Sequence, residues 1–112
     1  MLQEIVEDAR HKVIFYPKFH CELNYIENYW GQAKKYARRH CDYSFDGLQK
    51  TVPNALKSVS LIQIRRYARR AHRYMSAYYL GLTAKQAIFA VKKYRSHRRI
   101  PEDILQELDK LQ

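Results

Sequence analysis

The stretch that decides the predicted fold reads Pro17-Lys18-Phe19-His20-Cys21-Glu22-Leu23-Asn24-Tyr25-Ile26-Glu27-Asn28-Tyr29-Trp30-Gly31-Gln32-Ala33-Lys34-Lys35. It joins a short apolar run to a helix that carries one acidic residue, Glu27, among aromatic residues. Asn24 is a suitable N-cap, so Glu27 is expected at N3, where its carboxylate reaches back to the cap and meets the positive end of the helix dipole. The same junction places Glu27 at the carboxyl end of a strand, where open α/β sheets hold their active sites. Glu27 therefore has both a capping and a functional interpretation.

The residues before this stretch predict one helix and one strand. The helix covers residues 2–9, because its apolar residues share one face: Leu2, Ile5, Val6 and Ala9. The β-branched and aromatic run 12–16 predicts a strand that Pro17 ends. A strand needs a neighbour for its backbone groups, and no second strand is indicated downstream. We therefore expect a mostly helical C-terminal fragment of an α/β domain.

Further helices are predicted over residues 24–39, 44–59, 60–79, 84–100 and 102–111. The first turns Ile26, Trp30, Ala33 and Ala37 inward, although Trp30 with Tyr25 and Tyr29 also has the composition of a base-stacking platform. Ser44 or Asp46 caps the second helix, which Pro53 is expected to kink or restart, with Thr51 as a second cap; its apolar residues are Leu48, Val52, Ala55, Leu56 and Val59.

The helix over residues 60–79 is the most regular of the predicted elements. Its apolar seam recurs at intervals of three and four and comprises Leu61, Ile64, Ala68, Ala71, Met75 and Tyr78. Gly81 ends this helix and Thr83 caps the next, which turns Ala84, Ala87, Ile88 and Val91 inward before Pro101 ends it. The acidic segment 102–111 is expected either to fold back over a basic face or to fray.

The charge distribution indicates a polyanionic partner. The 112 residues carry a net charge of +10, and the span 47–101 contains no acidic residue. Nucleic acid is favoured over a membrane, because the basic helices display Tyr and His rather than an insertion face; a solvated basic surface is the alternative. The predicted DNA-binding residues are Arg65, Arg66, Arg69, Arg70, Arg73, Lys85, Lys92, Lys93, Arg95, Arg98 and Arg99.

Composition limits the class of protein further. The length suits one small domain, and ten tyrosines predict a core in which many hydroxyl groups need partners. Neither a membrane span nor a signal peptide is indicated, so a soluble intracellular protein with two reduced cysteines is expected.

The motif Leu23-Asn24-x-Ile26-Glu27-Asn28-x-Trp30-Gly31, followed by Lys34 and Lys35, resembles the last acidic motif of mariner-type DDE transposases. Two further segments are similar in sequence to DDE superfamily endonucleases of fungal transposable elements: residues 17–24 and Tyr94-Arg95-Ser96-His97-Arg98-Arg99-Ile100-Pro101. The resemblance covers roughly residues 2 to 101. Two departures stand out. Tyr25 replaces a frequent proline, and the first two aspartates of the family are absent, since only Glu4, Glu7 and Asp8 are acidic before Pro17.

The resemblance implies a fold, a site and a location. It divides the chain into a C-terminal piece of an RNase H-like DDE catalytic domain over residues 1–42, a basic helical extension over 43–101 and an acidic tail over 102–112. Glu27 matches the third metal-binding carboxylate, supported by Asn24 and Trp30, and the family uses Mg²⁺ or Mn²⁺ on DNA. A nuclear location follows, with the rest of a transposase or a second copy of the chain as further partners.

The chemistry of that family requires more carboxylates than this motif holds. Paired divalent ions need three carboxylates, so Glu27 alone is expected to bind metal weakly or not at all and to give no catalysis. Glu22 is interpreted as a solvated charge. Zinc at His20-Cys21 and His40-Cys41 is disfavoured, because an intact helix at a rise of ~1.5 Å per residue holds these pairs about 24 Å apart.

A rival interpretation belongs to a different class. The chain is then a non-enzymatic nuclear DNA- or RNA-binding helical protein, domesticated or unrelated to transposition, in which Glu27 is only a capping carboxylate.

Overall fold

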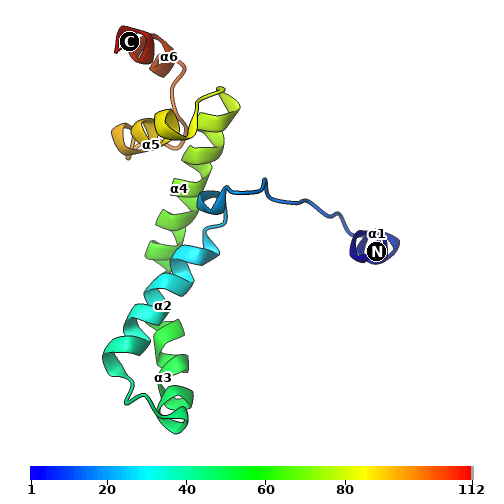
Figure 1. The fold of residues 1–112 in the computed structure, drawn as a ribbon, viewed down its shortest axis with the longest axis vertical. Helices are drawn as coiled ribbons and strands as arrows, with labels where there is room; N and C mark the ends of the chain where they lie inside the picture. The colour runs from blue at the N-terminus through cyan, green and yellow to red at the C-terminus, as the bar shows by residue number, and fades with distance from the viewer. Residues whose placement is uncertain (112) are drawn as a thin grey trace.

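The computed structural model describes residues 1–111, which form six α-helices and one 3₁₀ turn (Figure 1). The elements are α1 (Leu2–Asp8), η1 (Cys21–Leu23), α2 (Ile26–His40), α3 (Phe45–Lys57), α4 (Leu61–Tyr79), α5 (Ala84–Lys93) and α6 (Ile104–Lys110). The molecule measures 57 × 42 × 23 Å and has a radius of gyration of 18.7 Å. A compact chain of this length would have a radius near 13 Å, so the fold is elongated.

The predicted α/β architecture is wrong for the described residues. No strand forms between residues 1 and 111, and the run 12–16 is an extended segment without backbone partners. The residue types favoured a strand, but residues 1–111 supply no second strand to pair with it. The structure is therefore all-helical, and it contains no RNase H-like sheet.

Helix α1 and the segment that follows it stand apart from the other helices (Figure 1). None of the α1 residues is buried, and Ile14, Phe15 and Phe19 are exposed as well. We refer to residues 1–19 as the N-terminal arm. The apolar face predicted for residues 2–9 has no surface to cover.

Helices α2 and α3 pack side by side as a hairpin. The Tyr29 hydroxyl donates a 2.9 Å hydrogen bond to the carbonyl oxygen of Leu56, and Ala33 and Ala55 are buried between the helices. Trp30 is 46% exposed and lines an apolar hollow of about 240 Å³ along the hairpin, so it is only partly inward. The boundary predicted between residues 42 and 43 falls in the loop of this hairpin.

The start of α3 follows the prediction, but its interior does not. Ser44 is the N-cap and accepts a hydrogen bond from the Gly47 N–H at 3.0 Å. Pro53 lies inside α3, which runs as one continuous helix from Phe45 to Lys57, so the helix does not restart at this residue. Thr51 is not a second cap; its hydroxyl donates to the carbonyl oxygen of Gly47.

Helix α4 is the longest element and connects the two halves of the molecule. A capping box between Ser60 and Gln63 begins it, and the Gly81 backbone at φ +81° ends it. At that end the Leu82 N–H donates to Ala77 and the Gly81 N–H to Tyr78, which is the Schellman arrangement.

The main hydrophobic core surrounds the C-terminal half of α4. It comprises Leu23, Tyr74, Ala77, Leu82, Ala87, Ala90, Val91, Ile100 and Ile104. The predicted seam of α4 is only partly correct: Ala71 is buried as predicted, but Leu61 and Met75 are exposed, and Tyr74 and Ala77 are buried instead. In α5 the inward residues are Ala87, Ala90 and Val91, while Ile88 is exposed. Periodicity alone could not fix these faces, because η1 and α6 also pack on this core.

The acidic tail folds back rather than fraying. Ile104 of α6 is fully buried in the core, and Lys93 of α5 contacts Glu107 of α6 as an ion pair. None of the helices within residues 1–111 has the length and apolar character needed to cross a membrane.

Candidate nucleic-acid interface

One face of α4 gathers polar and basic side chains toward solvent. Arg69, His72, Ser76 and Tyr79 follow one another at intervals of three, four and three residues, so they lie along one side of the helix. The capping box at Ser60 and the Gly81 turn fix the two ends of this helix, and its opposite side packs into the core. This face is therefore presented by a rigid element.

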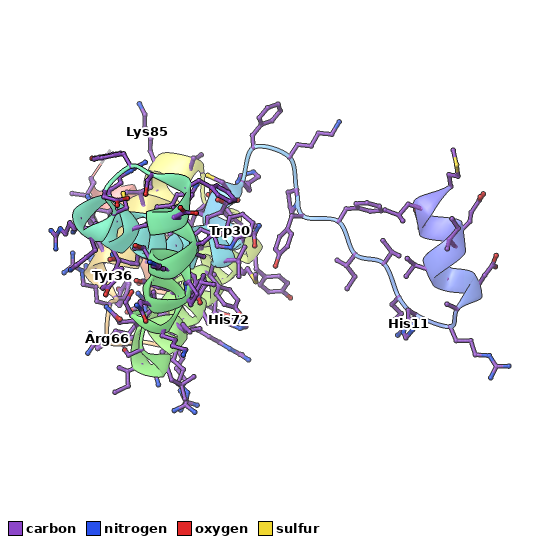
Figure 2. The ribbon with its side chains drawn as sticks, turned by 90° about the horizontal axis from the view of Figure 1, so that it is seen from below. His11, Trp30, Tyr36, Arg66, His72 and Lys85 are labelled. Atoms are coloured by element: carbon purple, nitrogen blue, oxygen red, sulfur yellow. The ribbon has the colours of Figure 1, made fainter. Side chains whose placement is uncertain are left out.

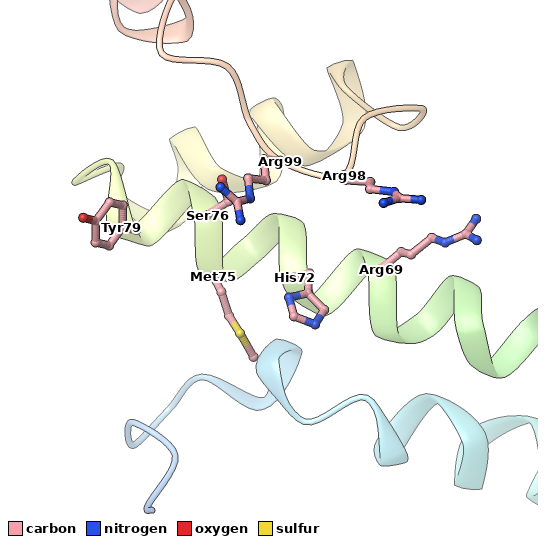
Figure 3. Close-up of a pocket in the computed structure, with 7 residues that line it drawn as sticks. All are labelled: Arg69, His72, Met75, Ser76, Tyr79, Arg98 and Arg99. Carbon is pink, nitrogen blue, oxygen red and sulfur yellow. The ribbon is translucent and has the colours of Figure 1, made fainter.

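The segment after α5 brings two more arginines to the same face. The Ile100 N–H donates a 3.0 Å hydrogen bond to the Ser76 hydroxyl, and the Ile100 side chain is buried in the core. This attachment holds Arg98 and Arg99 beside α4 (Figure 3). The two elements enclose a pocket of about 720 Å³, which we call the basic cleft; it is lined by Arg69, His72, Met75, Ser76, Tyr79, Arg98 and Arg99.

The two ends of the basic cleft carry different side chains. In Figure 3, Arg69 and Arg98 extend at one end, Arg99 lies beside Ser76, and Tyr79 stands at the other end. No carboxylate lines the cleft. Three guanidinium groups without a counter-charge create a positive potential that attracts an anionic ligand.

The remaining predicted DNA-binding residues are distributed over several faces. Arg65, Arg66, Lys85, Lys92 and Arg95 are exposed, and Figure 2, which looks along the molecule, places Arg66 and Lys85 at opposite edges of the helical part. Lys93 is engaged by Glu107 and lies 5.6 Å from the centre of the Tyr94 ring. The cations therefore do not form one continuous stripe.

Arg73 differs from the outward arginines that the helical pattern predicted, whereas Arg70 is exposed but lies on another side of α4 than the basic cleft. The Arg70 guanidinium lies 5.8 Å from the centre of the Tyr74 ring, on the side of α4 that faces η1 and the start of α2. Arg73 is half-buried and its Nε has no hydrogen-bond partner. Burial, followed by the charges of Arg70 and Arg95, lowers the pKa of Arg73.

Glu27 lies in the first turn of α2, but its local geometry departs from the prediction. Tyr25 is the N-cap, so Glu27 is at N2, and Asn24 makes no side-chain capping bond. Instead the Asn24 carbonyl oxygen accepts a hydrogen bond from the Glu27 N–H at 3.2 Å. The capping role of Asn24 is therefore wrong, because the turn closes one residue later than the capping pattern predicted.

Glu27 shares a second hollow, of about 250 Å³, with an arginine and another carboxylate. This hollow is lined by Cys21, Glu22, Glu27, Asn28, Arg70 and Tyr74. Among residues 1–111, no group of three or more His, Cys, Asp or Glu side chains is placed to hold a metal ion. Only two carboxylates line this hollow, and Arg70 adds a positive charge to the same lining, so this donor set does not suit Mg²⁺ or Mn²⁺.

Glu22 is not the solvated charge that its loop position suggested. Its carboxylate accepts hydrogen bonds from the Tyr78 hydroxyl and, at 2.9 Å, from Nδ1 of His20, and its side chain is 24% exposed. Burial alone would raise the pKa of Glu22, but the bonds from Tyr78 and His20 outweigh it and hold the pKa below its usual value. Burial and then the Glu22 carboxylate raise the pKa of the Tyr78 hydroxyl.

The two His-Cys pairs lie at opposite ends of α2. His20 and Cys21 are at η1, while His40 is the last residue of the unbroken helix and Cys41 is its C-cap. His40 Nδ1–H donates a 2.9 Å hydrogen bond to the Tyr36 carbonyl oxygen, and the His40 ring stacks on that of Tyr36. This role is structural, and the pairs do not converge on one site.

Sequence reasoning missed four residues of the basic cleft: His72, Met75, Ser76 and Tyr79. Met75 had been assigned to the apolar seam, and Tyr79 to the end of the helix. The interval of three and four residues that links Arg69 to Tyr79 was present in the sequence, but the partner segment around Ile100 was needed to reveal a cleft.

Comparison of the chain with models of known protein families, with curated proteins and with solved structures finds no match.

Proposed function

We propose that this protein binds DNA through the basic cleft and the exposed cations around it, chiefly by contacts to phosphate groups. The observation that carries the proposal is the grouping of Arg69, Arg98 and Arg99 in a cleft without a carboxylate. The absence of acidic residues from 47 to 101 extends the positive potential beyond the cleft.

The resemblance of residues 23–31 to a transposase motif supports DNA as the polyanion, and a nuclear location accords with that ligand. Catalysis is not part of the proposal, because the residues that share a hollow with Glu27 do not include two free carboxylates. They include Arg70 and Glu22, and the Glu22 carboxylate is hydrogen-bonded to the Tyr78 hydroxyl. The proposed activity is therefore binding, and the resemblance serves as an indication of ancestry.

Binding by this mechanism releases condensed counterions from the phosphate backbone. Affinity is expected to fall steeply with salt and to depend little on base sequence. If about five phosphate contacts form, log affinity plotted against log salt should have a slope near −4 to −5. Fluorescence anisotropy with two duplexes of unrelated sequence, each measured over a salt series, tests both expectations.

A charge-matched pair of variants locates the contacts. Replacing Arg69, Arg98 and Arg99 with glutamine should reduce the size of the slope by roughly 2 to 3 units. The control variant replaces the exposed Arg10, Arg38 and Arg39 with glutamine and so removes the same charge outside the cleft. It should reduce the size of the slope by less than about 1 unit. Absent binding at low salt, or binding insensitive to salt, would refute the proposed function.

A further inference from the structure

The basic cleft contains more than a phosphate site requires. Tyr79 is 92% exposed at one end, and the exposed Met75 lines the same pocket. Because the Tyr79 ring is exposed to solvent, it contributes no buried apolar area to the stability of this fold. Tyr79 and Met75 thus add apolar surface to a cleft that also contains three guanidinium groups.

The dimensions of the cleft suit nucleotides rather than a single anion. Its volume of about 720 Å³ lies within the range of roughly 300–1,000 Å³ typical of small-molecule sites. Ten residues separate Arg69 from Tyr79, which corresponds to ~15 Å along the helix axis. At ~3.4 Å per stacked base, this length accommodates about four nucleotides of one strand.

Duplex DNA cannot use all of this surface. In a duplex the bases are stacked on one another, and only phosphates and groove edges are accessible to a protein. Arg69, Arg98 and Arg99 can contact a duplex backbone, but Tyr79 can stack only on a base that has left the duplex or was never paired. An aromatic ring beside a positively charged groove is the arrangement with which proteins bind single strands.

We propose that the basic cleft is a site for unpaired nucleotides, in which Tyr79 stacks on a base and the arginines hold the neighbouring phosphates. His72 and Met75 line the same cleft between the two ends. The proposal rests on the nucleic-acid binding proposed above and adds a preference for single-stranded segments over duplex. The shared chemistry is a base with its phosphates, from either DNA or RNA.

The test separates stacking from charge. Fluorescein-labelled twelve-nucleotide oligothymidine, an abasic strand of equal length and a twelve-base-pair duplex are titrated with the wild-type protein at one salt concentration. Oligothymidine should bind at least about fivefold more tightly than the abasic strand, since a stacked base contributes about 1–3 kcal/mol and 1.4 kcal/mol corresponds to tenfold. Oligouridine as a fourth probe shows whether DNA or RNA is preferred.

Variants of one exposed tyrosine sharpen the result. Tyr79→Ala should weaken oligothymidine binding about tenfold and leave the abasic strand and the duplex unchanged, whereas Tyr79→Phe should retain wild-type binding. The control Tyr43→Ala removes an equally exposed ring, 87% accessible, from the loop before α3 and should change none of the affinities.

The outcomes distinguish the two proposals. Equal binding of oligothymidine and abasic strand, or a Tyr79→Ala variant that binds oligothymidine like the wild type, overturns the unpaired-nucleotide site while the phosphate binding stands. Failure of every probe to bind at low salt overturns the proposed function itself.

Discussion

The N-terminal arm and the core around α4 contain similar apolar residues, but those of the arm are exposed and those of the core are buried. Ile14, Phe15 and Phe19 in the arm are exposed, whereas Leu82, Ile100 and Ile104 are buried in the core. The core residues come from segments that converge on α4, while the arm lies beside no other element (Figure 1). Burial in this protein thus depends on the presence of a second surface, and hydrophobicity of a segment alone does not provide it.

The two regions should differ most in resistance to proteolysis. Trypsin is expected to cut after Arg10, Lys12 and Lys18 at least ~100-fold faster than within α4 or α5, because cleavage in a packed helix first requires local unfolding. Mass spectrometry of timed digests at low enzyme ratio measures these rates. Similar rates in both regions would mean that the arm is packed in solution.

An Ile→Ala substitution made once in the core and once in the N-terminal arm should give the next largest difference, in the free energy of unfolding. Ile104→Ala removes a fully buried side chain and should cost about 2–5 kcal/mol of unfolding free energy. Ile14→Ala, at a position 88% exposed, should change it by less than about 0.5 kcal/mol. Urea unfolding followed by circular dichroism measures both, and a large loss for Ile14→Ala would reveal a hidden contact of the arm.

The contact between η1 and α4 marks the point where the arm joins the core, and we expect it to be sensitive to acid. Tyr78→Phe removes the hydroxyl that donates to Glu22 and should cost ~1–2 kcal/mol near neutral pH. The folded-state pKa of Glu22 lies below its unfolded value, so its contribution is fully present above the unfolded pKa and is lost as pH falls through the folded pKa.

Acidification from pH 7 to below the folded-state pKa of Glu22 should therefore destabilise the wild type more than Tyr78→Phe, in which the Glu22 pKa moves back toward its usual value. Urea midpoints at several pH values between 7 and 3 provide the measurement. An equal acid loss in both proteins would assign the pH dependence to other carboxylates.

The smallest expected effects have opposite signs at two glycines. Gly81→Ala places a side chain at φ +81° and should cost ~1 kcal/mol, while Gly31→Ala lies in open space within α2 and should stabilise by up to ~1 kcal/mol. Thermal melts of both variants test the pair. Stabilisation by Gly81→Ala would show that the turn after α4 relaxes to another conformation.

Local signals in the sequence predicted much of the helical structure. Ser44, Ser60 and Thr83 were expected near helix starts and are N-caps, and Gly81 follows the last turn of α4. These features depend on hydrogen bonds between residues three or four apart, so the sequence contains all the partners. The strand over 12–16 failed because its stabilisation depended on a partner that the described chain lacks.

The candidate site was predictable only in part, for a related reason. The charge run contained the cleft arginines Arg69, Arg98 and Arg99, but it did not separate them from Arg70, which lines the hollow beside Glu27. The bond between Tyr78 and Glu22 joins residues 56 positions apart, and no periodic pattern indicates such a pair. Which face of α4 is free depends on η1 and the Ile100 segment, and both are non-local.

The attachment of Ile100 has a consequence for the entropy of binding. Its side chain is buried and its N–H is bound to Ser76, so the backbone that carries Arg98 and Arg99 is already ordered before any ligand arrives. Ordering a flexible backbone costs about 1–2 kcal/mol of conformational entropy per residue, and in this segment the loss occurs during folding rather than during binding. A ligand has only the arginine side chains left to immobilise, which makes this pair of cations preorganised.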